Sequence, residues 1–160
     1  MFCIVLLKIT ACYNFKGISI PPDIDTFYVE NFTLTPQAIA APINLSQDLT
    51  EELRRKIREE TRLTNDNYEP DISFSGEITK YSIIPIAPEP GNTTSLNRLE
   101  ISVKITYKNE KNSEDDYSKN YSDFEDFDSN QNFNALEDEL TDIIIEDILE
   151  RIFNDAFTGW

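Results

Sequence analysis

The sequence predicts an α+β fold in which two helices lie on one face of a four-stranded mixed sheet, as a two-layer sandwich. Residues 71–86 and 99–107 alternate between apolar and polar side chains, as the strands of a half-buried sheet do. Segments with helical spacing of apolar residues flank this pair, and each can cover its apolar face. With 160 residues, 39% of them hydrophobic, and no visible internal repeat, the chain suffices for one domain with a core.

Segments 71–86 and 99–107 are the expected centre of the sheet, as antiparallel neighbours joined by a short loop. Their inward faces carry Ile72, Phe74, Gly76, Ile78, Leu99, Ile101, Val103, Ile105 and Tyr107. Their outward faces carry Ser73, Ser75, Glu77, Thr79, Glu100, Ser102, Lys104 and Thr106. The apolar phase shifts near residues 80–83, which predicts a bulge or bend there.

The segment before this pair predicts a strand, a loop and a helix. Residues 24–32 supply the strand, with Phe27 and Val29 inward, and the proline-containing residues 34–43 form the loop. We expect Ser46 to cap a helix that runs to about residue 62 and buries Leu49, Leu53 and Ile57. A right-handed strand–helix–strand crossover should leave the first strand parallel to residues 71–86.

The remainder of the chain supplies an edge strand and a long helix. Residues 117–122 predict a fourth strand at the edge of the sheet. Apolar residues recur every three or four positions over 134–157, which predicts the second helix. The expected order is therefore strand, helix, strand, strand, strand, helix.

Two helices on one side leave the other face of the sheet uncovered, and this face is rich in hydroxyl groups. Residues 87–97 form a loop longer than a tight turn requires, which makes it a further contact site. Two interpretations stay open, a hydrated surface and a face that docks in a polar cavity. The candidate partner-binding residues are Ser73, Ser75, Thr79, Thr93, Thr94, Ser102 and Thr106.

Composition excludes several classes of function. The chain has 14 Lys and Arg against 30 Asp and Glu, a net charge of −16, which argues against nucleic acid as a partner. It has no His, and we find no Gly-rich phosphate loop or esterase-type Ser motif. We therefore expect neither an enzyme nor a cofactor.

One acidic segment has the spacing of a calcium loop. Asp126, Asp128, Asn130 and Glu137 stand at its positions one, three, five and twelve. Gln131 replaces the glycine that the sharp turn needs at position six, and Asp and Asn before a helix commonly serve as turn and cap residues. We therefore expect no metal site there.

The first residues have the composition of a bacterial lipoprotein signal. Residues 1–11 are apolar, and Ile9-Thr10-Ala11-Cys12 has the form of a lipobox, which makes Cys12 the expected lipidated residue. The basic start is missing and Lys8 interrupts the apolar run, as in a signal that begins further upstream. Residues 12–22 would form a tether and residues 23–160 a single domain. The alternative is a buried first strand with an ordinary cysteine.

Six segments of the chain carry a family resemblance. They are CYNF at 12–15, SIPPDI at 19–24, LSQDLT at 45–50, FSGEI at 74–78, LNRL at 96–99 and ALEDEL at 135–140. In these segments and their order the chain resembles the LptE family of outer-membrane lipoproteins. The resemblance implies the same sandwich and a lipid anchor in the periplasmic leaflet of the outer membrane. It also implies a role as a plug that assists assembly of the LptD-like barrel and delivery of lipopolysaccharide.

The resemblance further implies that lipopolysaccharide binds through basic residues near the loop between the central strands. Arg98 and Lys80 are the candidates in this sequence. A chain with a net charge of −16 should repel an anionic glycolipid unless a local basic patch or a divalent cation intervenes. The alternative function is a free-standing periplasmic ligand-binding or adaptor lipoprotein that is not tied to a barrel.

Overall fold

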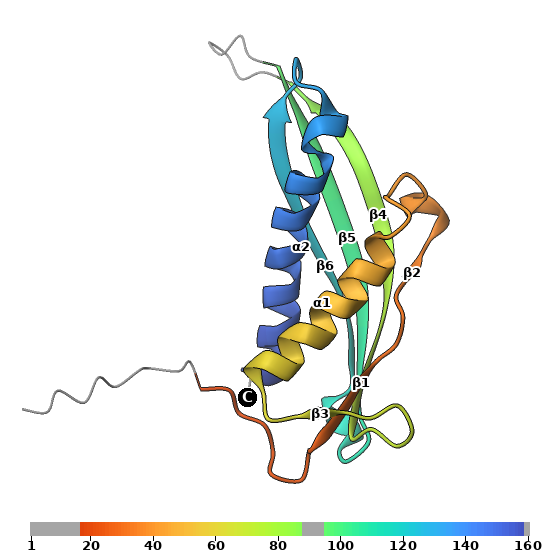
Figure 1. Ribbon diagram of the computed structural model, residues 1–160, viewed down its shortest axis with the longest axis vertical. Helices are drawn as coiled ribbons and strands as arrows, with labels where there is room; N and C mark the ends of the chain where they lie inside the picture. Colours follow the sequence, from red (N-terminus) through yellow and green to blue (C-terminus); the bar gives the residue numbers. More distant parts are fainter. Residues whose placement is uncertain (1–16, 88–94, 159–160) are drawn as a thin grey trace, which may run out of the picture.

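A computed structural model describes residues 17–87 and 95–158, and it confirms an α+β fold with two helices on one face of a mixed sheet (Figure 1). Among these residues, none of the helices is long and apolar enough to cross a membrane. The elements in order are β1 (Thr26–Val29), β2 (Thr33–Leu34), the 3-10 helix η1 (Pro36–Ala38), α1 (Leu45–Glu60), β3 (Thr64–Asn65), β4 (Ile72–Ile86), β5 (Leu96–Asn109), the 3-10 helix η2 (Ser113–Asp115), β6 (Tyr117–Asp128) and α2 (Phe133–Phe157).

The sheet has six strands, so the predicted number of four is wrong. Its order is β3-β1-β4-β5-β6, and β2 also pairs with β4. The expected first strand at residues 24–32 is shorter, because β1 covers only Thr26–Val29; β2 follows at Thr33–Leu34 along the same edge of β4. The short β3, which follows α1, pairs with the outer edge of β1. The predicted parallel pairing of the first strand with residues 71–86 is confirmed.

Phe32 lies between β1 and β2 and is buried in the core. Its backbone N–H donates a hydrogen bond to Thr50 Oγ1 of α1 at 2.9 Å, and its side chain is only 4% exposed. The ring lies against Gly76 of β4, where an added Cβ would be 2.9 Å from Phe32 Cε1. The absence of a side chain at Gly76 therefore gives Phe32 its place in the core.

The central pair has the predicted faces and the predicted bulge. The inward residues of β4 as far as Ile83 and of β5 from Leu99 are buried apart from Gly76 and Ile83. The strands are antiparallel with Ser75 opposite Thr106. The register shifts between Ile78 and Lys80. Because the bulge reverses the alternation, Tyr81 continues the core face and Lys80 joins the opposite face.

The helices cover the core as expected, with a corrected start for the first. Leu49, Leu53 and Ile57 of α1 are fully buried, and α2 begins within one residue of the predicted position. The predicted N-cap Ser46 is wrong, because the N-cap of α1 is Asn44. Ser46 lies inside the helix, where its carbonyl accepts a hydrogen bond from Thr50 Oγ1. Strand β6 continues to Asp128, past the predicted end at 122, because it stays paired with β5 as far as Leu96.

The Asp71 side chain, just before β4, is hydrogen-bonded to the backbone at the start of β1. Its carboxylate accepts hydrogen bonds from the backbone N–H groups of Asp25 at 2.8 Å and Thr26 at 2.9 Å, and pairs with Lys111 at 2.9 Å. Partial burial by itself would raise the pKa of this carboxyl group, but the hydrogen bonds outweigh burial and hold the pKa well below its usual range. The contact therefore stabilises the folded chain while Asp71 is ionised.

Candidate functional site

Both helices lie on the same side of the sheet, so the side chains that point to the other side are left uncovered by the described chain (Figure 1). We call this surface the open face. The pairing register places Ser75, Thr106 and Ser118 in one row across it, and Lys80, Ser102 and Ser122 in another. The five predicted partner-binding residues in the described chain, Ser73, Ser75, Thr79, Ser102 and Thr106, are thereby brought together. Thr93, Thr94 and Cys12 lie outside the described residues.

Hydroxyl groups of the open face bond across the strands. Ser102 Oγ and Ser122 Oγ are 2.8 Å apart, and Thr106 Oγ1 and Ser118 Oγ are 3.2 Å apart. Thr79 lies in the bulge and donates from Oγ1 to the carbonyl of Ser102 at 3.2 Å. A hydroxyl group has one donor and two acceptor positions, so these pairs retain capacity for a partner. Ser102 is only 9% exposed. This capacity is therefore accessible mainly at Thr106, Ser118 and Ser122.

The two proposed lipopolysaccharide contacts also lie on the open face, and each is paired with a carboxylate. Lys80 Nζ is 2.7 Å from Glu100 Oε2. Arg98 binds Asp126 through Nε at 2.7 Å and Nη2 at 2.9 Å, and its guanidinium lies 3.6 Å from the centre of the Phe124 ring. The hydrogen bonds raise the pKa of Arg98 and lower that of Asp126. Both cations are therefore neutralised locally.

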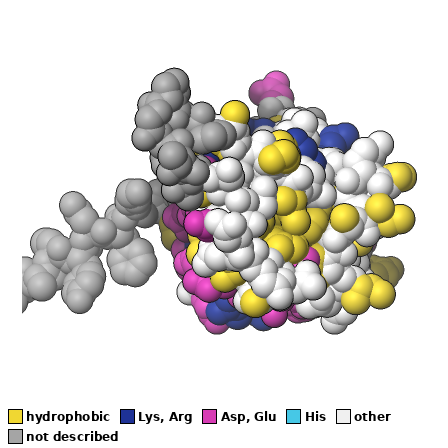
Figure 2. All heavy atoms as spheres, turned by 90° about the horizontal axis from the view of Figure 1, so that it is seen from above, with side chains coloured by type: hydrophobic (Ala, Val, Ile, Leu, Met, Phe, Trp, Pro, Cys, Tyr) yellow, Lys and Arg dark blue, Asp and Glu magenta, His cyan; other side chains and the backbone are white. Residues whose placement is uncertain are grey.

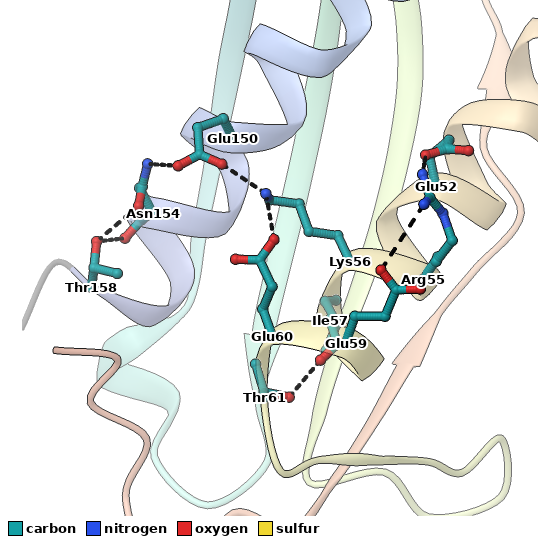
Figure 3. Close-up of polar contacts among 10 residues, drawn as sticks. All are labelled: Glu52, Arg55, Lys56, Ile57, Glu59, Glu60, Thr61, Glu150, Asn154 and Thr158. Atoms are coloured by element: carbon teal, nitrogen blue, oxygen red, sulfur yellow. Dashed lines mark hydrogen bonds and ion pairs between the residues drawn. The ribbon is translucent and has the colours of Figure 1, made fainter. Parts of the chain in front are cut away.

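The excess negative charge lies largely on the helix side of the molecule. A groove of about 750 Å³ runs between α1 and α2, and eight carboxylate side chains line it against two cations, Arg55 and Lys56. In Figure 3, Lys56 bridges the two helices, with Nζ 2.7 Å from both Glu60 and Glu150. The open face is balanced by comparison, because Lys80, Arg98, Lys104 and Lys108 share it with Glu77, Glu100, Asp126 and Asp128.

A family model described as LptE, lipopolysaccharide-assembly, matches residues 24–156. The chain belongs to the LptE family. The predicted family is thereby confirmed, and with it the class of lipopolysaccharide-assembly lipoproteins, which is not a class of enzymes. No curated protein matches the sequence.

Solved structures of bacterial proteins share the fold of this LptE family member. A minor lipoprotein from Acinetobacter baumannii aligns with a TM-score of 0.54 at 12% identity, over 82% of this chain and 91% of its own. A Xanthomonas campestris protein aligns with a TM-score of 0.55 at 9% identity, over 89% and 92% of the two chains. Lipoprotein B from Nitrosomonas europaea gives a TM-score of 0.50 at 15% identity, over 86% and 88%.

The residues with calcium-loop spacing have other partners in this family member. Asp126 is bound by Arg98, Asp128 accepts hydrogen bonds from Asn130 within the turn, and Glu137 accepts one from the hydroxyl of Tyr81. Among the described residues, no three or more His, Cys, Asp or Glu side chains are grouped as a metal site would require.

Sequence reasoning missed the apolar contribution to the open face. Phe124, 45% exposed, and Ile84, 36% exposed, lie on this face near Arg98. Phe124 was overlooked because the fourth strand was expected to end at residue 122. The alternation of residues 117–122, taken two positions further, would have placed it on the open face.

Proposed function

We propose that this chain is an outer-membrane lipoprotein that plugs the lipopolysaccharide transport barrel, assists assembly of that barrel and helps to deliver lipopolysaccharide to the outer membrane. One observation supports the proposal above all: the open face is polar, balanced in charge and uncovered by the chain's own helices. Membership of the lipopolysaccharide-assembly family supports the class of function.

The open face suits the interior of a barrel for a physical reason. The lumen of an outer-membrane barrel is polar and lined by strands, so hydroxyl groups can exchange hydrogen bonds with it at a small desolvation cost. Enclosing the acidic groove between α1 and α2 would instead remove many like charges from water. The helix side is therefore the side that we expect to face away from the barrel wall or to remain hydrated.

The position of residues 17–22 agrees with an anchor at one end of the domain. Ser19 N–H donates to the carbonyl of Phe157 at 2.9 Å, so residues 17–22 lie beside the last turn of α2. In Figure 1 this end of the domain is opposite the end of β4 and the start of β5. Lipidation of Cys12 would thus hold the domain at the periplasmic face of the outer membrane, with the distal ends of β4 and β5 pointing away from the anchor.

Arg98 and Lys80 remain the proposed contacts for lipopolysaccharide. An anionic lipid group would have to displace Asp126 from Arg98, or Glu100 from Lys80. Such an exchange keeps each cation paired and makes direct lipid binding weaker than it would be at an unpaired basic cluster. The plug role does not depend on this contact.

Site-specific photo-crosslinking tests the proposed orientation. Crosslinkers at Ser75 and Thr106 on the open face should capture a large outer-membrane barrel protein, and control crosslinkers at Arg55 and Glu146 on the helices should capture little of it. Capture from the helix positions alone would show that the helices form the docking surface and would refute the proposed orientation. Recovery of the detergent-extracted protein as a lone lipidated monomer would support the alternative of a free-standing adaptor lipoprotein.

A further inference from the structure

The outer edge of β4 has paired strands along only part of its length. Strands β1 and β2 occupy this edge as far as Ile78, whose carbonyl accepts a hydrogen bond from Thr35 N–H at 3.0 Å. Within the described chain, no strand pairs with the same edge over residues 80–86 (Figure 1). A strand edge of this kind carries backbone groups that a further strand could satisfy.

The bulge determines which backbone groups point outward from this edge. The carbonyls of Phe74 and Ile78 point to the outer edge, since they accept from Glu30 N–H at 2.8 Å and Thr35 N–H at 3.0 Å. The register shift after Ile78 moves the alternation by one residue. Tyr81 and Ile83 therefore direct their N–H and C=O groups outward. Pro85, the next residue that faces outward, has no N–H, so no hydrogen-bond donor lies on this edge beyond Ile83.

Four isoleucine side chains around this edge are exposed. Ile83 is 44% and Ile84 36% exposed, on opposite faces of β4. The loop that contains η1 packs against β4 and carries Ile39 at 83% and Ile43 at 95% exposure. Figure 2 shows hydrophobic side chains gathered on the right, the side on which this loop and β4 lie in Figure 1. Ser82 Oγ is buried without a hydrogen-bond partner.

The opposite edge of the sheet is protected in the usual way. Strand β6 carries Lys119, Asp123 and Glu125 among its residues, and charged side chains discourage pairing with another strand. The outer edge of β4 over residues 81–84 is Tyr-Ser-Ile-Ile and has no charge. This edge therefore lacks the protection that the other edge has.

We propose that the outer edge of β4 at residues 81–83 accepts an extended segment of the barrel protein, which adds a strand to the sheet. The inference rests on the proposed function and names a second contact for it. The edge borders the open face, because Ser82 and Ile84 belong to that face. The segment would be apolar at alternate positions to cover Ile83 and Ile39, and would carry a polar group opposite Ser82.

A second copy of this chain is a poorer occupant of the edge. Two such edges would share only the short stretch between the bulge at Thr79 and Pro85. Each copy also has a net charge of −16, so association of two copies is opposed by repulsion. A segment of a different protein need not carry this charge, so this repulsion does not apply to it.

Hydrogen exchange on the purified complex, compared with the isolated chain, tests the inference directly. We expect the Ile83 amide to exchange at least about tenfold more slowly in the complex, because strand addition gives that N–H an acceptor. Three variants separate backbone pairing from side-chain contact. Ile83→Pro should weaken association about tenfold, Ile83→Ala should weaken it less, and Ile143→Ala, which removes a similarly exposed side chain from α2, should have no effect.

The possible results distinguish this inference from the proposed function. If the Ile83 amide exchanges at the same rate in the complex as in the isolated chain, and the complex still forms open-face crosslinks, strand addition is refuted and the plug role is not affected. Equal loss of association in Ile83→Pro and Ile83→Ala would also overturn it, since only side-chain contact would then matter. Protection that appears in the isolated chain as its concentration rises would assign the edge to a second copy. Failure to form any complex would refute both proposals.

Discussion

The substitution Gly76→Ala tests whether the stability of the core depends on the close approach of Phe32 to β4. A Cβ at this position would stand 2.9 Å from Phe32 Cε1 and 3.0 Å from Ile105 Cδ1, closer than carbon atoms pack without displacement. The Phe32 ring has little freedom to move, because its backbone N–H is bound to Thr50, a fully buried residue of α1. Gly76→Ala should therefore force a shift in the first strand region or in α1.

The expected cost follows from two opposing effects. Overpacking a core by a methyl group lowers the free energy of unfolding by about 1–3 kcal/mol. Replacing glycine lowers the entropy of the unfolded chain, which raises the free energy of unfolding by about 0.4–1 kcal/mol. Gly76→Ala should thus lower the free energy of unfolding by about 1–2 kcal/mol and Tm by about 3–8 °C. Gly17→Ala is the matched control, since nothing lies within 4 Å of a Cβ there, and it should change stability by less than about 0.5 kcal/mol.

A double-mutant cycle identifies the contact responsible. Phe32→Leu alone should destabilise the chain by leaving a gap, and the methyl group of Gly76→Ala can enter that gap. The double variant should be at least about 1 kcal/mol more stable than the sum of the two single losses predicts, as measured by urea unfolding of the domain. Additivity within about 0.5 kcal/mol would refute the claim that Phe32 occupies the space left by Gly76.

Three further predictions concern polar contacts and the anchor. Asp71→Ala should cost about 3 kcal/mol at neutral pH, because it removes the acceptor of two backbone N–H groups and the partner of Lys111. Because the pKa of Asp71 is lowered by folding, its contribution is complete above about pH 5 and lost as pH falls below the unfolded value of about 3.9. Urea titrations of the wild-type chain should show this loss, and those of the variant should not. Lys56→Met should cost about 1 kcal/mol at low salt and less at high salt, since it removes the bridge to Glu150. Cys12→Ala should move the protein from the membrane to the soluble fraction, and continued membrane association without an acyl mass on the wild-type chain would contradict the lipoprotein assignment.

The faces of the long elements could be predicted from the sequence. Alternation in residues 71–86 and 99–107 separated the core face from the open face, although Ser102 of the open face is buried and Ile83 of the core face is exposed. The three-to-four spacing of residues 134–157 placed the second helix. The hydroxyl-rich face followed from these two patterns. Such periods are local properties, because each side chain's direction is fixed by the backbone geometry of its own element.

The sequence alone thus determined the class of fold, the inward and outward faces, and a net charge of −16 that argues against nucleic-acid binding. The tertiary structure decided where that charge lies, which carboxylates neutralise Lys80 and Arg98, and how Phe32 packs against Gly76 between β1 and β2. It also decided that the outer edge of β4 stays unpaired beyond Ile78 within the described chain. These features depend on which distant segments become neighbours and at which register, and a local pattern cannot specify either.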